Sequence, residues 1–300
     1  MSAATGLGVL DLAILEACEA AGALPTADHI KTARVLDALY DATGVGPLIG
    51  YEPLLHMARS WSAHLLLIDF HGSAGRPEYT AAPPRYTTCR LTPLGAAVLD
   101  AERGRLGPLP IGLINGDSHA GGRRPPLDPA RVVQAIRAAA TASDADLTAI
   151  VGLPAFPTAC EVVGDAQRFA AGDSVVLTLR ARIRGEGPST LVMDRLPPGS
   201  STSEIANMVD QRMQMEKKGR GGPVGIRDVN DASAGEVTRL IFQLAPGASM
   251  AQVRDELSES WGVRRTLTVR LDRPLPQLIR EYAVGDDLDH RLALITAATP

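Results

Sequence analysis

The chain has 300 residues, of which 45% are hydrophobic and 21% charged, a composition typical of a soluble globular protein with room for two domains. Its apolar runs are far too short to span a membrane, and no basic region precedes an apolar stretch at the N-terminus, so we expect neither a membrane span nor a secretory signal. The net charge of −4 gives no overall attraction to nucleic acid, and three isolated cysteines exclude a disulfide framework and favour a reducing cytoplasm.

Apolar residues at helical spacing predict three helices near the N-terminus. The first covers about Leu7–Ala21, the second is capped by Thr26, and the third covers about Tyr51–Trp61. A short buried strand is expected at Leu65–Ile68, followed by a glycine-rich turn at His71–Gly75. Three short helices followed by a strand and a flexible loop are typical of a winged helix-turn-helix.

Two further helices have clear start signals, at Thr92-Pro93 and at Asp128-Pro129. From about residue 150 the sequence changes to mixed helix and strand patterns. The expected strands are Val175–Arg184, Thr190–Met193, Val237–Leu244 and Thr266–Leu271, and the expected helices are Thr202–Met215 and Met250–Leu257. Because their connections look like hairpins and split units, we expect an α+β domain with a mostly antiparallel sheet.

Charge is unevenly distributed along the chain. From Arg85 to Arg137 there are eight arginines and four acidic residues, a local charge of +4. Residues 1–84 hold four basic and nine acidic residues, a local charge of −5. A basic face is therefore expected around residue 86, whereas an extended DNA-binding surface over the N-terminal part is not.

One stretch combines a nucleophile with cations. Tyr86 directly follows Arg85 on a loop stiffened by two prolines, and Arg90 comes four residues later. A tyrosine hydroxyl is a weak nucleophile, but a neighbouring cation stabilises the phenolate and the charge of a phosphoryl transition state. On these residues alone, a surface or packing role for the Arg-Tyr pair is the commoner one. The histidines show no His-Glu-x-x-His or similar spacing, so no metal site is predicted in this chain.

The surroundings of Tyr86 resemble a known family. Arg85-Tyr86-Thr87 and Arg90-Leu91 are similar to the Ala-Ala-Met-Arg-Tyr-Thr-Glu-x-Arg-Leu segment of the A subunit of DNA gyrase and topoisomerase IV. Lys31–Val35 resembles the Lys-Ser-Ala-Arg-Val of that family. Other similar segments follow in the family's order: Tyr51–Ala58, Ile68–Gly75, Leu113–Ser118, Leu153–Thr158, Asp194–Pro197 and Gly225–Asp231.

The resemblance implies an α+β fold with two units. A winged-helix breakage-reunion domain would cover residues 1–127, and a tower-like α+β domain would cover residues 128–300. It also implies a type II DNA topoisomerase, an isomerase that cleaves and rejoins DNA through a 5′-phosphotyrosyl bond at Tyr86, with Arg85 assisting at the phosphate. The cations that could contact the DNA backbone, or could simply be solvated, are Lys31, Arg34, Arg90, Arg123 and Arg124.

The same resemblance implies partners that this chain lacks. Mg²⁺ would be held by carboxylates of a separate gyrase B-type subunit, which would also bind ATP, and the sequence has no phosphate-binding Gly-x-x-x-x-Gly-Lys-Ser/Thr loop of its own. The expected substrate is double-stranded DNA. The chain is expected to form a homodimer, to act in the cytoplasm and to have no contact with membranes.

Several family features are missing. The helix at Leu10–Glu16 lacks the family's His-Arg-Arg, Thr43–Pro47 lacks two histidines, and Thr88 replaces a glutamate. The loop near His119–Gly122 offers no apolar wedge between bases. The coiled-coil exit gate and the C-terminal DNA-wrapping domain are expected to be absent. Losing one charge-stabilising donor typically slows such chemistry about 100- to 1000-fold. The alternatives are therefore a catalytically degenerate DNA-binding or gyrase-modulating protein, and a gene fragment without function.

Overall fold

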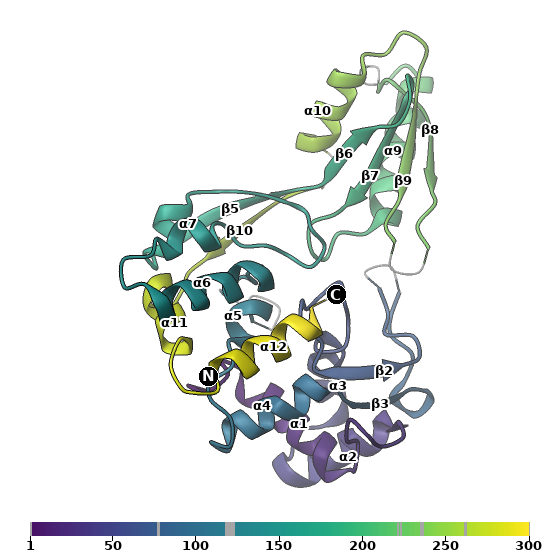
Figure 1. Ribbon diagram of the computed structural model, residues 1–300. Helices are drawn as coiled ribbons and strands as arrows, with labels where there is room; N and C mark the ends of the chain where they lie inside the picture. The colour runs from purple at the N-terminus through teal and green to yellow at the C-terminus, as the bar shows by residue number, and fades with distance from the viewer. Residues whose placement is uncertain are drawn as a thin grey trace.

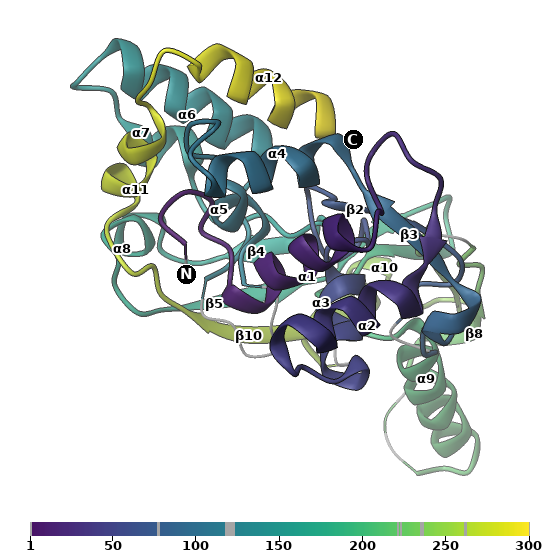
Figure 2. The same cartoon turned by 90° about the horizontal axis from the view of Figure 1, so that it is seen from below.

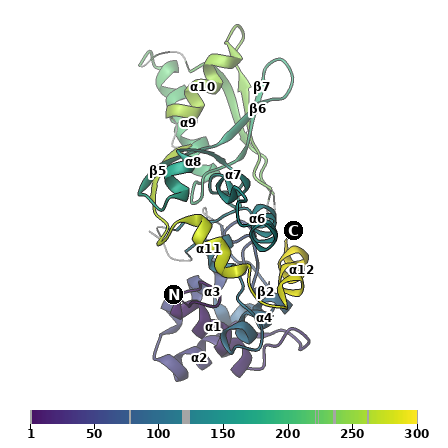
Figure 3. The same cartoon turned by 60° about the vertical axis from the view of Figure 1, so that its left-hand side comes forward.

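The computed structural model describes residues 2–76, 79–117, 124–220, 222, 224–234, 237–260 and 263–299. These ranges hold twelve α-helices and three small antiparallel sheets, which confirms the expected α+β class. Figures 1 and 3 show an elongated molecule with both chain ends in one half and the sheet of β6, β7, β8 and β9 at the far end of the other. Within the described ranges, no helix is long and apolar enough to cross a membrane.

The N-terminal part surrounds the first sheet, whose strand order is β1-β3-β2. Helices α1 to α4 pack around this sheet and share one hydrophobic core with it. Because β3 is the central strand, the turn η1 that precedes it is held next to both β1 and α2. The elements are α1 Val9–Ala20, β1 Ile30–Lys31, α2 Thr32–Thr43, α3 Pro47–His56, β2 Ile68–His71, the 3₁₀ turn η1 Pro84–Tyr86, β3 Thr88–Leu91 and α4 Pro93–Glu102.

The middle of the chain and its last two helices extend the same core. The second sheet has the order β10-β5-β4, and α11 and α12 return to pack on α6, as Figure 2 shows from below. Arg291 of α12 is buried and donates hydrogen bonds to the backbone of Pro108 and Tyr282. The elements are α5 Ile111–Asn115, α6 Pro129–Thr141, α7 Leu147–Val151, β4 Glu161–Val163, α8 Ala166–Ala170, β5 Val175–Arg180, β10 Arg264–Val269, α11 Leu275–Tyr282 and α12 Leu288–Ala298.

The third sheet, of order β6-β7-β9-β8, has a hydrophobic core of its own. Alternate residues of its strands, such as Leu191 and Met193, share this core with Ile205 of α9 and Leu257 of α10. The assignment of residues 1–127 to a winged-helix domain and of residues 128–300 to a tower-like domain stays a prediction. The elements are β6 Arg182–Gly185, β7 Thr190–Arg195, α9 Thr202–Lys217, β8 Ile226–Asp231, β9 Leu240–Leu244 and α10 Met250–Ser260.

Three elements of the N-terminal part differ from their expected bounds. The second helix begins at Thr32 and not near Thr26, because Ile30 and Lys31 pair with β3 as strand β1. The third helix begins at Pro47, because proline is favoured at the first helical position, and it ends at His56. The strand expected at Leu65–Ile68 lies at Ile68–His71.

The cause of this last shift is a buried amide. Asn115 donates a hydrogen bond of 2.8 Å to the carbonyl of Leu65 and accepts one of 2.9 Å from its N–H group. These two bonds occupy the backbone of Leu65, so it does not pair with a strand. The expected helix starts farther along the chain are confirmed: Thr92 caps α4 by accepting from the N–H group of Gly95, and Asp128 caps α6.

Candidate functional site

Tyr86 lies on the surface at the end of the short turn η1. Its side chain is 65% exposed, and its backbone N–H donates a 2.9 Å hydrogen bond to the carbonyl of Pro83. The guanidinium carbon of Arg85 lies 4.7 Å from the centre of the Tyr86 ring, a cation–π arrangement. The two neighbours that the sequence singled out are therefore in contact and open to a large substrate.

The turn that carries Tyr86 is tied to the start of α2. Thr87 is buried, and its carbonyl accepts a 3.1 Å hydrogen bond from the N–H of Thr32, the first residue of α2. The hydroxyls of Thr87 and Thr32 are also hydrogen-bonded, at 2.9 Å. On the other side of the turn, the Tyr51 hydroxyl donates to the carbonyl of Ala82 at 2.5 Å. Tyr86 is thus fixed beside a helix N-terminus, where the helix dipole favours an anion.

Two predicted DNA-contacting cations lie beside this turn. Lys31 is exposed and is paired in register with Thr88, two residues after Tyr86. Arg34 is exposed in the first turn of α2. Together with Arg85 they form a group of three exposed cations around the start of α2, which we call the tyrosine face.

The other predicted cations are placed differently. Arg90 donates 2.9 Å and 3.0 Å hydrogen bonds to Asp69 and to the carbonyl of Ala27. Arg124 is only 12% exposed and is ion-paired with Asp117. Both guanidinium groups therefore stabilise the fold of this chain. Arg123, and the loop where a base-wedging residue was sought, lie outside the described residues.

Sequence reasoning missed a cluster on the outer side of the first sheet. His29, Asp69 and His71 each offer a ligand atom, and these atoms lie within 4.8 Å of one another. Burial would raise the pKa of Asp69, but the hydrogen bond from Arg90 and the contact with His29 outweigh it and lower that pKa. This cluster could hold a metal ion.

A second feature that was not foreseen is a cavity of about 410 Å³ between the segment after α3 and the third sheet. It is lined by Trp61, by the buried Ser200 and by several arginines: Arg76, Arg184, Arg195 and Arg239. The Ser200 hydroxyl has no hydrogen-bond partner among the described residues. The cavity lining therefore combines four arginines with a buried hydroxyl group.

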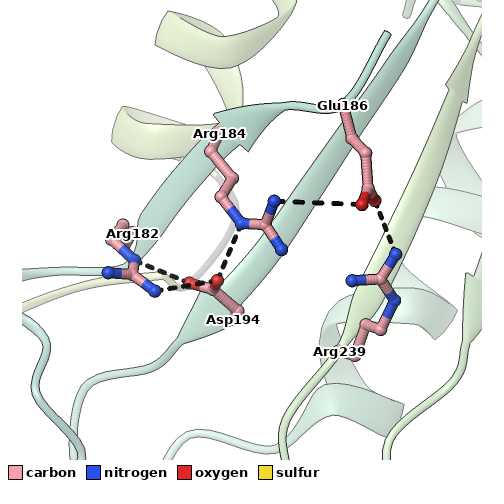
Figure 4. Close-up of polar contacts among 5 residues, drawn as sticks. All are labelled: Arg182, Arg184, Glu186, Asp194 and Arg239. Atoms are coloured by element: carbon pink, nitrogen blue, oxygen red, sulfur yellow. Dashed lines mark hydrogen bonds and ion pairs between the residues drawn. The ribbon is translucent and has the colours of Figure 1, made fainter.

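Three residues of the cavity lining, Arg184, Asp194 and Arg239, belong to a network of charges (Figure 4). Asp194 of β7 accepts hydrogen bonds from Arg182 at 2.8 Å and from Arg184 at 3.0 Å, both on β6. The pKa of Asp194 is lowered, mainly by the hydrogen bond from Arg182 and also by the bond from Arg184, although burial acts to raise it. Glu186 lies between Arg184 and Arg239 and accepts a bond from Arg239. These arginines are held in fixed positions by two carboxylates.

The sequence of the chain was compared with protein-family models and with curated proteins. No protein-family model matches the chain. The DNA gyrase A subunits of Mycobacterium bovis and of Mycobacterium tuberculosis are 28% identical over 98% of this chain and 40% of the relative. The gyrase A subunit of Streptococcus pyogenes is 26% identical over 98% of this chain and 39% of the relative. The chain spans about two fifths of the length of these curated relatives. The protein is a distant homologue of the A subunit of DNA gyrase.

Proposed function

We propose that the protein is an A-subunit-like component of a type IIA DNA topoisomerase, which cleaves and rejoins double-stranded DNA through Tyr86. One observation carries the proposal: Tyr86 is exposed, in contact with Arg85, and fixed beside the N-terminus of α2. Homology to the gyrase A subunit over 98% of the chain supports the same reaction class. The ATP hydrolysis that drives such enzymes would come from a B-type subunit.

The chemistry asked of Tyr86 is one transesterification. Its phenolic oxygen attacks a DNA phosphorus atom, the phenolic proton passes to solvent, and the 3′-oxygen of the neighbouring nucleotide leaves and takes up a proton. One phosphate ester bond replaces another, so the reverse reaction can rejoin the strand. Arg85 and the N–H groups at the start of α2 would offset the negative charge that develops on the phosphate. Lys31 and Arg34 would position the DNA backbone.

The residues that flank Tyr86 do not fit a Mg²⁺ ion. They are the cations of the tyrosine face and hydroxyl residues such as Thr88, whereas Mg²⁺ prefers carboxylate and phosphate oxygens. We therefore assign Mg²⁺, whose charge would neutralise the reacting phosphate, to a B-type partner. Homodimer formation is also proposed, because two strands must be cut by two copies of Tyr86, and sedimentation velocity of the purified chain would test it.

A second candidate is a DNA-binding or gyrase-modulating protein that does not cleave. Its support is the small number of cations near Tyr86: Arg90 and Arg124 are held by Asp69 and Asp117, and α1 contains no basic residue. If each missing donor slows phosphoryl transfer about 100- to 1000-fold, cleavage would be lost while backbone binding survives. Such a protein would bind DNA through Lys31 and Arg34 without forming an adduct.

A cleavage assay separates these candidates. Plasmid DNA is incubated with the protein, Mg²⁺ and the gyrase B subunit of the same organism, and detergent then traps any protein-linked breaks. We expect linked breaks with the wild type and with Tyr79→Phe, since Tyr79 is an exposed tyrosine of the same loop, and none with Tyr86→Phe. Breaks that persist in Tyr86→Phe would reject the role of Tyr86. Binding without breaks in the wild type would favour the second candidate.

A further inference from the structure

The outer side of the first sheet brings His29 next to Asp69 and His71 of β2, which lie about forty residues later in the chain. Ile30 and Phe70 are both paired with the buried Cys89, one on each side of the central strand. Because side chains alternate along a strand, the neighbours of Ile30 and Phe70 project from the opposite side of the sheet. His29, Asp69 and His71 therefore share that side.

The distances between these groups are close to those of a metal site. Nε2 of His29 lies 3.0 Å from Oδ2 of Asp69, and the rings of His29 and His71 are stacked with their centres 3.8 Å apart. All three ligand atoms lie within 4.8 Å of one another. A Zn²⁺ ion holds histidine nitrogens and carboxylate oxygens at about 2.0–2.2 Å, so atoms around one ion are separated by up to about 4 Å. Small side-chain rotations would close the site.

The three side chains still have nitrogen and oxygen atoms that can bind a metal ion. His29 is only 13% exposed, and its Nε2 makes no aligned hydrogen bond among the described residues, although it contacts Asp69. The stacked ring of His71 is exposed and would leave one coordination position open to water. Arg90 holds Oδ2 of Asp69 at 2.9 Å and thereby fixes the carboxylate, as outer partners of metal ligands commonly do.

We propose that His29, Asp69 and His71 bind one divalent transition-metal ion, of the class of Zn²⁺ or Co²⁺. Two imidazole nitrogens and one carboxylate oxygen suit these ions, whereas Mg²⁺ prefers oxygen ligands only. The site is separate from the Mg²⁺ proposed for a B-type partner. Once bound, the ion would fasten the segment before β1 to β2, on either side of the strand that follows Tyr86, and would stabilise the sheet.

Metal binding can be measured without an assay of DNA cleavage. The untagged full-length protein is treated with chelator, dialysed against ZnCl₂ or CoCl₂, and analysed for bound metal, for the visible absorption of Co²⁺ and for its melting temperature. We expect one ion per chain and a melting temperature raised by Zn²⁺. Both effects should be lost in His71→Ala, an exposed position whose replacement should not impair folding, and in His29→Ala.

The matched control is His290→Ala, an exposed histidine on α12 that should bind metal like the wild type. Circular dichroism would confirm that each variant is folded. Absence of stoichiometric metal in the wild type would overturn the proposal. It would also be overturned if His71→Ala kept its metal, or if His290→Ala lost it.

Discussion

Replacing Lys31 and Arg34 together by alanine should weaken DNA binding and make it less sensitive to salt. Both side chains are exposed, and neither forms an ion pair within the part of the chain that the structure describes. Lys31 lies beside Thr88, and Arg34 lies in the first turn of the helix that holds the Tyr86 loop. If each contacts one phosphate, their loss removes two charge contacts without disturbing the core.

The magnitude follows from counterion release. Each phosphate neutralised on B-DNA contributes about −0.9 to the slope of log affinity against log salt concentration, so the double variant should have a slope smaller by about 1.8. For a fourfold rise in salt, from about 50 to about 200 mM, the wild type should lose about 12-fold more affinity than the variant.

Fluorescence anisotropy with a short labelled duplex, titrated at several salt concentrations, measures these slopes. The control is Arg137→Ala combined with Arg280→Ala, which makes the same change in net charge on α6 and α11. Figure 1 shows these helices on the opposite side of the molecule from β3. The control should keep the wild-type slope. Equal slopes for the wild type and for the double variant of Lys31 and Arg34 would refute the proposed phosphate contacts. If the control variant showed the same decrease in slope, the effect would come from net charge and not from contacts at Lys31 and Arg34.

Three further predictions concern the stability of the part of the molecule around the first sheet. Asn115→Leu removes both hydrogen bonds to the backbone of Leu65 and should lower the free energy of unfolding in urea by about 3 kcal/mol. Gly95→Ala would place a methyl group 2.2 Å from the carbonyl oxygen of Leu67 and should cost about 1–3 kcal/mol in the same assay. Burial lowers the pKa of His64, so its contribution to stability is present above the unfolded pKa of about 6.5 and is lost as the pH falls through the folded pKa. His64→Gln should therefore flatten the decline in melting temperature below about pH 6.5.

Each of these variants has a matched control. Asn207→Leu changes an exposed residue of α9, and Gly46→Ala adds a methyl group with no atom within 4 Å, so both should have much smaller effects. His290→Gln, at an exposed position, should keep the wild-type dependence on pH. Losses in the controls as large as those in the core variants would contradict the packing described.

The structural features that the sequence predicted well involve residues close together in the chain. Thr92 and Asp128 cap helices because their side chains bond to N–H groups three residues later, a relation that is visible in the sequence. The exposed contact between Arg85 and Tyr86 is equally local. The family resemblance, carried by short motifs in order, was confirmed as distant homology.

The features that sequence did not predict depend on strand pairing. The register of β2 and β3 places Arg90 opposite Asp69, a partner that the sequence did not indicate, and its expected contact with DNA stays a prediction. Pairing of β1 and β2 with the central strand β3 brings His29 and His71 together, although they are far apart in the chain. Cys18 and Cys89, isolated in the sequence, meet in the core, where their hydrogen bond raises the pKa of Cys18. Such contacts require the fold, because no spacing in the chain encodes them.

The central claim is that Tyr86 becomes linked to DNA, and mass spectrometry of the trapped complex tests it most directly. The protein, the gyrase B subunit of the same organism, Mg²⁺ and a DNA duplex are incubated together, denatured, and digested with nuclease and protease. We predict that the peptide containing Tyr86 carries a nucleotide joined through its 5′-phosphate, and that the peptide containing Tyr79 is unmodified. A nucleotide found on any other residue, or none on Tyr86 when DNA strands are cut, would contradict the claim.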